Sequence, residues 1–207
     1  MTKTLNTCAK SIPFEEVVTF HGHACPGLAL GYRVARAAMR RLRSDRSGDE
    51  EFVAVVENDA CGVDAVQYLC GCTFGKGNLV FRDHGKQAFT FYNRQTGEGL
   101  RIYAEPADTD NPAEPEFAAL KRKPKRTPDE NDRLTLLMEQ RIQRILSMPE
   151  KDFLTIAEPR EPMPIKARIF NSGRCSACGE RVMQTRLYSV DDHALCTACA
   201  PASTSQR

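Results

Sequence analysis

Apolar and polar positions alternate with a helical period near the start of the chain. Residues 26–43, PGLALGYRVARAAMRRLR, place apolar side chains on one face at spacings of three and four residues. Arginines repeat on another face, which we interpret as solvated, so the pattern predicts an amphipathic helix. The apolar face contains Leu28, Tyr32, Ala35, Met39 and Leu42, and the basic face contains Arg33, Arg36, Arg40 and Arg43.

Shorter runs with the character of strands follow this helix. Residues 52–57, FVAVVE, predict a buried strand, and residues 62–69 predict a short helix that starts just after Cys61. Three further strands, joined by turns, are predicted at residues 79–81, 87–93 and 100–105. A helix, a strand and a helix followed by an antiparallel meander predict an α+β fold with a mixed sheet flanked by helices.

The second half of the chain changes character several times. Residues 106–128 are rich in Pro, Asp and Glu and also contain the basic run KRKPKR at residues 121–126. A helix is then predicted by the capping box Thr127 with Glu130 and by Pro128 at the first helical position. Its apolar stripe, for a core or an interface, contains Leu134, Leu137, Met138, Ile142, Ile145 and Leu146. A proline-punctuated linker, AEPREPMP, separates a predicted core domain, residues 1–160, from a small domain, residues 166–207.

Composition narrows the class of protein. With 207 residues and 41% hydrophobic residues the chain can bury a core, and its formal net charge of +2 does not indicate a nucleic-acid-binding protein. No run of about 18 apolar residues is present, and the first residues lack the apolar core of a signal peptide, so we expect a cytoplasmic protein without a membrane span. Nine cysteines then indicate metal ligands or reactive thiols rather than a disulfide framework.

Four of these cysteines form a predicted structural zinc site near the C-terminus. Two C-x-x-C pairs, Cys175 with Cys178 and Cys196 with Cys199, are separated by seventeen residues. Each turn brings two sulfurs to one side of a loop, and two turns complete a tetrahedral shell with no open position. A thiol redox pair would not need both turns, and substitution of a ligand by Asp191, Asp192 or His193 is a lesser alternative. Few aromatic residues accompany this module, so we expect protein docking or stabilisation rather than nucleic-acid binding.

A second candidate site lies in FHGHACPG, residues 20–27. Cys25 precedes Pro26, so the pattern places it at a helix N-cap, where the helix dipole favours a thiolate. His21 and His23, two residues apart, can present both imidazoles on one side of an extended loop. Together with Cys25 they supply up to three ligands for zinc or another transition metal.

A further ligand source lies where a strand ends and a helix begins. Cys61 occupies that position, with Asp64 placed as a capping residue in the first turn of the helix. Two cysteines at two helix N-termini converge if the helices pack side by side, although a cysteine at a strand end is often only a small buried apolar residue.

The remaining core cysteines belong to the sequence LCGCT. Cys70 is predicted to pack in the core, and Cys72 opens a glycine-rich loop in which Lys76 provides a cation for an anionic ligand or remains solvated. An iron–sulfur cluster held by Cys25, Cys61, Cys70 and Cys72 is disfavoured because the spacing matches no common pattern.

Three blocks of sequence resemble one family. FHGHACPGLALGYRVA, CGVDAVQ and GCTFGKGNLVFRDHGKQAFTF, within residues 14–92, are similar to the FmdE family, which is named after formylmethanofuran dehydrogenase, and occur in the family's order. The four-cysteine module resembles the treble-clef zinc finger that some members carry after the core.

The resemblance implies a thioredoxin-like core with a mixed sheet, a site that can hold zinc, and association as a homodimer. By motif it assigns the site to His21, His23, Cys25 and Cys61, with Asp64, Cys72, Lys76 and Lys86 near the pocket. Some members are encoded beside a molybdenum or tungsten formylmethanofuran dehydrogenase, which implies an oxidoreductase partner, and others occur where no such enzyme is expected.

Two functions are therefore expected. In the first, Cys25, Cys61 and His23 take part in catalysis at a core metal, and Lys76 and Asp64 bind the cofactor or ligand. The substrate class implied by family context is a one-carbon, pterin or molybdenum/tungsten-cofactor intermediate. In the second, the chain delivers metal or cofactor and docks on an oxidoreductase through the zinc finger and the helix at residues 129–146.

Overall fold

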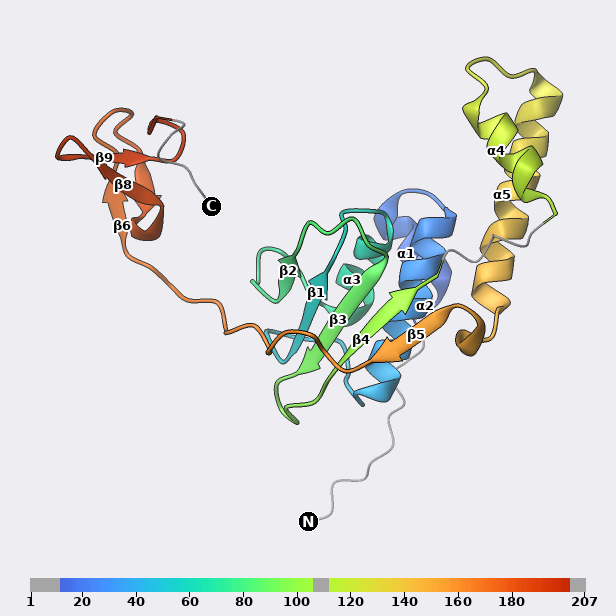
Figure 1. The fold of residues 1–207 in the computed structure, drawn as a ribbon, viewed down its shortest axis with the longest axis horizontal. Helices are drawn as coiled ribbons and strands as arrows, with labels where there is room; N and C mark the ends of the chain where they lie inside the picture. Colours follow the sequence, from blue (N-terminus) through green and yellow to red (C-terminus); the bar gives the residue numbers. More distant parts are fainter. Residues whose placement is uncertain (1–11, 106–111, 202–207) are drawn as a thin grey trace, which may run out of the picture. The chain divides into compact units, whose positions relative to one another are not determined.

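The computed structural model describes residues 12–105 and 112–201, so residues 1–11 and 106–111 of the predicted core domain and 202–207 of the predicted small domain lie outside the described residues. The chain divides into two compact units, Met1–Lys166 and Ala167–Arg207. Figure 1 shows the elements of both units. In chain order the elements are α1 (Phe14–His21), α2 (Pro26–Arg41), β1 (Phe52–Val56), α3 (Gly62–Cys70), β2 (Leu79–Phe81), β3 (Ala88–Asn93), β4 (Gly99–Ala104), α4 (Glu114–Arg122), α5 (Pro128–Ser147), η1 (Glu150–Asp152), β5 (Leu154–Ala157), β6 (Ser172–Arg174), β7 (Arg181–Met183), η2 (Gln184–Arg186), β8 (Leu187–Val190) and β9 (His193–Cys196).

A five-stranded mixed sheet forms the centre of the first unit. Its order is β2-β1-β3-β4-β5, with β2 parallel to β1 and each remaining pair antiparallel. This confirms the predicted α+β class with a mixed sheet. The predicted meander is wrong at its first strand, because β2 pairs with β1 rather than with β3. The reason is helix α3, which connects β1 to β2 as a crossover and so returns the chain in the parallel direction.

Side chains of β1 alternate between two apolar layers. Phe52, Ala54 and Val56 belong to the main core, which packs against α1, α2 and α3 on one face of the sheet (Figure 1). Val53 and Val55 belong to a smaller cluster on the other face, where Met163 from the segment after β5 packs against them.

Helix α2 confirms the predicted amphipathic helix, and Arg36, Arg40 and Arg43 are exposed as predicted, but Arg33 is partly buried. The Arg33 guanidinium donates hydrogen bonds of 2.6–2.7 Å to the backbone carbonyls of Ile145, Leu146 and Met148. Arg40 forms an ion pair with Glu150. The last turn of a helix leaves its carbonyls without partners, so Arg33 caps the C-terminus of α5 and fixes it against α2.

Helix α5 begins as predicted, with the reciprocal capping box of Thr127 and Glu130. Ile142 and Ile145 lie in the main core, so the second half of the helix packs within its own chain. Leu137, nearer the start of α5, is buried beside α4.

Helices α1 and α4 and strand β5 of the first unit have no counterpart among the predictions. Helix α1 has a single buried residue, Val17, helix α4 has only Phe117, and the edge strand β5 buries only Leu154. With so few apolar positions, none of them carries a periodic pattern long enough to identify it. None of the helices within residues 12–105 and 112–201 is long and apolar enough to span a membrane.

The second unit consists of two short antiparallel hairpins. Strand β6 pairs with β7, and β8 pairs with β9. In the described part of this unit, the two buried residues are Cys175 and Cys196.

Candidate metal centres

The corner between α1 and α2 gathers the first group of ligands. Helix α1 ends at His21, and Gly22 adopts the left-handed conformation, φ 97°, that turns the chain away from the helix. Cys25 is the N-cap of α2, as predicted, and its sulfur accepts a hydrogen bond from the Leu28 N–H at 3.3 Å. In this corner one ligand atom from each of His21, His23 and Cys25 lies within 4.8 Å of the other two. The three side chains can therefore hold one metal ion.

The orientation of His21 is fixed from α3. Its Nδ1 lies 2.7 Å from Oδ2 of Asp64, and the other Asp64 oxygen accepts a hydrogen bond of 3.1 Å from Gln67. A carboxylate only accepts hydrogen bonds, so Nδ1 carries the proton and Nε2 has a free lone pair. That nitrogen lies 4.0 Å from the Cys25 sulfur, on the side of the ligand group. A carboxylate behind a ligating histidine is the usual arrangement of protein metal sites.

Replacing Asp64 by asparagine is therefore expected to weaken metal binding at the core site. The neutral amide would lower the basicity of His21 and loosen its orientation, with a loss of affinity of roughly 10- to 100-fold. Competition with a chelator measures this change directly. Asp59→Asn, in the loop before Cys61, is the matched control and should leave the affinity unchanged. Equal affinities for Asp64→Asn and the unsubstituted chain would contradict the orienting role.

Cys61 lies beside this group but is not one of the three mutually close ligands. Its thiol interacts with the Cys25 thiol, and its sulfur lies 4.0 Å from the position of a Cβ added at Gly27. It occupies the N-cap of α3, but with a helical backbone and no side-chain capping bond. The expected capping role of Asp64 is also wrong, because its carboxylate holds His21 instead.

The charge state of Cys25 differs from the expectation. Burial raises the pKa of the Cys25 thiol above its ordinary value, and the interaction with Cys61 raises it further. The Leu28 N–H lowers the pKa, but by less than burial raises it. The helix N-terminus alone does not make Cys25 a thiolate, so its deprotonation would accompany the binding of a cation.

Two glycines allow Cys25 and Cys61 to meet. A Cβ added at Gly31 in α2 would lie 2.2 Å from the Gly62 carbonyl oxygen and 2.4 Å from the Gly62 Cα in α3. The two helices therefore touch backbone to backbone near their N-termini, where the two cysteines lie. Sequence reasoning missed this contact. The available signal was the spacing of Gly27 and Gly31, one helical turn apart on the face of a predicted helix.

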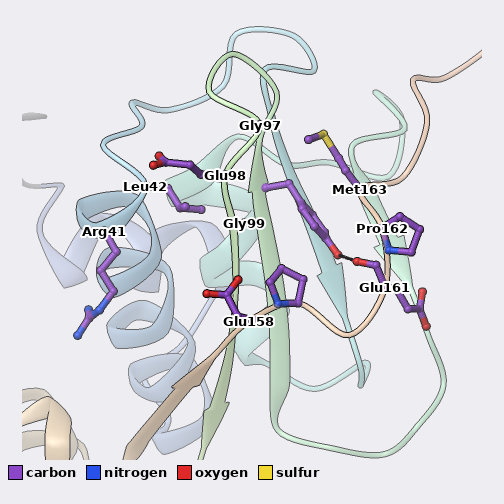
Figure 2. Close-up of a pocket in the computed structure, with 11 residues that line it drawn as sticks. Arg41, Leu42, Gly97, Glu98, Gly99, Glu158, Glu161, Pro162 and Met163 are labelled. Carbon is purple, nitrogen blue, oxygen red and sulfur yellow. Dashed lines mark hydrogen bonds between the residues drawn. The ribbon is translucent and has the colours of Figure 1, made fainter.

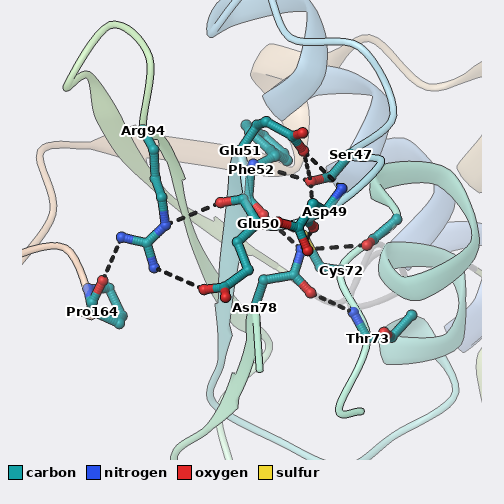
Figure 3. Close-up of polar contacts among 11 residues, drawn as sticks. Ser47, Asp49, Glu50, Glu51, Phe52, Cys72, Thr73, Asn78, Arg94 and Pro164 are labelled. Carbon is teal, nitrogen blue, oxygen red and sulfur yellow. Dashed lines mark hydrogen bonds and ion pairs between the residues drawn. The ribbon is translucent and has the colours of Figure 1, made fainter. Parts of the chain in front are cut away.

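The structure does not bring Cys72 or Lys76 to this group. The Cys72 thiol is buried and donates to the carbonyl of Phe52, the first residue of β1 (Figure 3). The same carbonyl accepts a hydrogen bond from the side-chain amide of Asn78. Burial raises the pKa of Cys72 to about 12. The Lys76 ammonium donates to the carbonyl of Ser47 at 3.1 Å. Cys72 lies at the first residue of β1, whereas Cys61 follows its last residue. The two ends of this five-residue strand are roughly 15 Å apart.

The other expected residues have separate positions. Cys70 is fully buried in the main core, as predicted. Lys86 lies in the loop after β2, where its carbonyl accepts a hydrogen bond from Asn58. An anion site at Lys76 stays a prediction, and it would be distinct from the histidine–cysteine group.

A pocket of about 520 Å³ also opens in the first unit, away from these ligands. It is formed by the end of α2, the β3–β4 turn and residues 158–163, as Figure 2 shows. Tyr92 donates a hydrogen bond of 2.6 Å to the Glu161 carbonyl at its wall. No cysteine or histidine is among the residues that line it, so it offers none of the chemistry of the metal group.

The second unit contains the other ligand group. The sulfurs of Cys175, Cys178, Cys196 and Cys199 all lie within 4.8 Å of one another. Backbone N–H groups of Cys178 and Cys196 lower the pKa of Cys175 to about 6, whereas hydrogen bonding with the Cys196 and Cys178 side chains raises the pKa of Cys199 to about 12. The four thiols lie so close together that the pKa values of Cys175 and Cys199 depend on the neighbouring thiols. Four sulfur donors in such a cluster suit a metal cation, which would bind them as thiolates.

Comparison with known proteins identifies the family. The profile described as "FmdE, Molybdenum formylmethanofuran dehydrogenase operon" matches residues 20–155. A protein of Archaeoglobus fulgidus, named a probable S-adenosyl-L-methionine-binding protein, is 36% identical over 190 residues, which cover 87% of this chain and 50% of that protein. The chain thus spans about half the length of this curated relative.

A solved structure gives the same answer. The crystal structure of a tungsten formylmethanofuran dehydrogenase FmdE-like protein from Syntrophus aciditrophicus matches with a TM-score of 0.61 at 25% identity, over 93% of this chain and 96% of that chain. The family profile covers the corner between α1 and α2, all of α5, and the sheet except for the end of β5. The chain belongs to the FmdE family.

Proposed function

We propose that the corner between α1 and α2 is a site for zinc or another transition metal, and that this site carries the function of the core. The observation behind the proposal is the group of His21, His23 and Cys25, with His21 oriented by Asp64. Cys61, in contact with Cys25, is the fourth candidate ligand. Imidazole and thiolate are the donors that zinc prefers in proteins, and they also suit several other transition metals.

Access to the site supports a reactive rather than a purely structural centre. His23 is exposed, and Cys25 and Cys61 are only partly buried, so a small ligand can approach from solvent. A metal held there would act as a Lewis acid toward that ligand. The chain's own residues would bind the metal through two imidazoles and one or two sulfurs, and Asp64 would keep the His21 proton on Nδ1.

The family supports a role beside an oxidoreductase. We infer that the chain is catalytic in its own right or accessory to an enzyme of the formylmethanofuran dehydrogenase class, as a cytoplasmic homodimer. The alternative is a carrier that delivers metal or cofactor and docks through the C-terminal unit, with structural zinc held by Cys175, Cys178, Cys196 and Cys199. A carrier would exchange its core metal readily, whereas a catalytic centre would retain it.

The Archaeoglobus fulgidus relative favours a specific small ligand. Its name gives S-adenosyl-L-methionine as the bound molecule, and the similarity covers 87% of this chain. The amino and carboxylate groups of this molecule are suitable metal ligands, so the core metal provides a physical reason for binding.

Metal analysis of the purified chain tests the proposal. The unsubstituted chain should contain two equivalents of metal, and Cys25→Ala or Cys61→Ala should contain one, because each removes a core sulfur and leaves the C-terminal cluster intact. Calorimetric titration with S-adenosyl-L-methionine on the same samples should show binding only to the chain with two equivalents. Cys70→Ala, a buried cysteine outside both groups, is the control. If Cys25→Ala and Cys61→Ala retain both metals, the ligand assignment is wrong.

A further inference from the structure

A buried ion pair lies on the face of the sheet opposite the helices. Glu57 directly follows β1, Arg101 lies in β4, and their side chains meet at 2.7 Å with exposures of 9% and 8%. The hydrogen bond from Arg101 holds the pKa of Glu57 below its ordinary value, so Glu57 is a carboxylate. A buried ion pair is seldom more stabilising than apolar residues of similar size, so its presence in a sheet invites a functional explanation.

The second carboxylate oxygen of Glu57, which Arg101 does not bind, contacts a histidine from the neighbouring loop. His84 Nδ1 lies 3.3 Å from Glu57 Oε2, while Arg101 occupies Oε1. Because the carboxylate accepts only, Nδ1 is the protonated nitrogen and Nε2 retains its lone pair. The His84 side chain is 47% exposed, although its partner is buried. The Glu57 carboxylate thus orients the imidazole at Nδ1, while solvent can reach the half-exposed ring. A general base has this arrangement.

The loop that carries His84 is held by backbone bonds. The Arg82 N–H donates to the Val56 carbonyl at 2.8 Å and the Lys86 N–H to the Glu57 carbonyl at 3.0 Å. Gly85 has a φ of 63°, in the left-handed region, which turns the chain back after His84. The position of His84 over Glu57 is therefore a property of the loop backbone.

A buried amide connects this loop to the loop that carries Cys61. Asn58 donates from Nδ2 to the Lys86 carbonyl at 2.6 Å and accepts at Oδ1 from the Ala60 N–H at 3.0 Å. Both loops follow the carboxyl ends of the parallel strands β1 and β2, the edge at which α/β sheets bind their ligands. Asn58 thus links the loop that carries His84 to the loop that leads to Cys61, at one edge of the sheet.

We propose that His84 is a proton-transfer residue of this edge, positioned by Glu57 and Arg101, for a small ligand that gains or loses a proton while bound there. Nε2 takes a proton from the ligand, or returns one to it, and the Glu57 carboxylate stabilises the imidazolium that forms. The inference rests on the proposed function only in that the core metal would hold the ligand.

Site-resolved carbethoxylation tests the proposal without knowledge of the ligand. Diethyl pyrocarbonate transfers its ethoxycarbonyl group to the neutral imidazole, with release of carbon dioxide and ethanol, and peptide mass spectrometry reads each of the four histidines separately. With the zinc-loaded full chain at pH 8, His84 should react about tenfold faster than the exposed His193, the effect of one hydrogen bond to a charged group. Glu57→Gln should bring His84 to the rate of His193.

A second variant controls for misfolding of the first. Glu57→Gln leaves Arg101 buried without its partner, so the double variant Glu57→Gln/Arg101→Gln, which removes both charges, should give the same loss of reactivity. A role limited to satisfying Glu57 would leave Nε2 with ordinary reactivity. The proposal is overturned if His84 reacts no faster than His193, or if both variants leave its rate unchanged.

The same modification experiment tests the metal centre independently. Zinc should protect His21 and His23 from modification and leave His84 reactive. If zinc does not protect His21 and His23, only the assignment of the core metal ligands is contradicted. If His84 is unreactive, only the proton-transfer role of His84 is contradicted.

Discussion

Serine in place of Cys178 is expected to remove one equivalent of metal and to unfold the second unit, with the first unit unchanged. The described part of this unit buries only Cys175 and Cys196, so it has almost no apolar core. Binding of a metal by four thiolates contributes roughly 10–16 kcal/mol in modules of this size. Three sulfurs and a hydroxyl would not replace that contribution, so the two hairpins should lose their structure together.

Limited proteolysis and metal analysis measure this outcome. Cleavage should become rapid after residue 167 in Cys178→Ser, while thermal unfolding of the first unit keeps its midpoint, because the two units are separately compact. Ser176→Ala, an exposed position in the same C-x-x-C turn, should retain the metal and the protease resistance. Undiminished resistance of Cys178→Ser would show that the hairpins are stable without a complete sulfur shell.

Features encoded in consecutive residues could be predicted from the sequence. The helical period of α2, the capping box of α5 and the two C-x-x-C turns depend on neighbours within a few residues, and the structure has each of them. The close approach of His21, His23 and Cys25 is of the same kind, because one corner holds all three. The position of Cys61 between a strand and a helix also predicted that it converges with Cys25 if the two helices pack side by side, but it did not predict the glycine contact between those helices.

Features that depend on distant partners could not be predicted. The parallel pairing of β2 follows from the route of α3, and the capping role of Arg33 depends on the position of α5, more than one hundred residues away. The role of Asp64 required His21, 43 residues earlier in the chain. The pKa of Cys25 was misjudged because burial, which a sequence does not report, outweighs the helix N-terminus.

The largest effect on the core site is expected from a residue that binds nothing. Gly31→Ala should destabilise the first unit and abolish the core metal, although alanine favours a helix over glycine by about 1 kcal/mol. The added Cβ would lie 2.2 Å from the Gly62 carbonyl oxygen, a backbone atom that cannot rotate away. Helices α2 and α3 must therefore separate, at a cost of about 3 kcal/mol for an overpacked contact. The net loss of about 2 kcal/mol corresponds to a fall in Tm of about 4 to 8 °C.

Thermal unfolding and metal analysis distinguish this clash from a general effect of glycine replacement. Gly75→Ala is the control, because an added Cβ there meets nothing within 4 Å, and it should change neither Tm nor metal content. In Gly31→Ala the C-terminal equivalent should remain while the core equivalent is lost, because separation of the helices moves Cys25 away from Cys61. A raised Tm with two equivalents of metal would contradict the close helix contact. The expected result would place the origin of the metal site in the glycine contact that lets two helix N-termini converge.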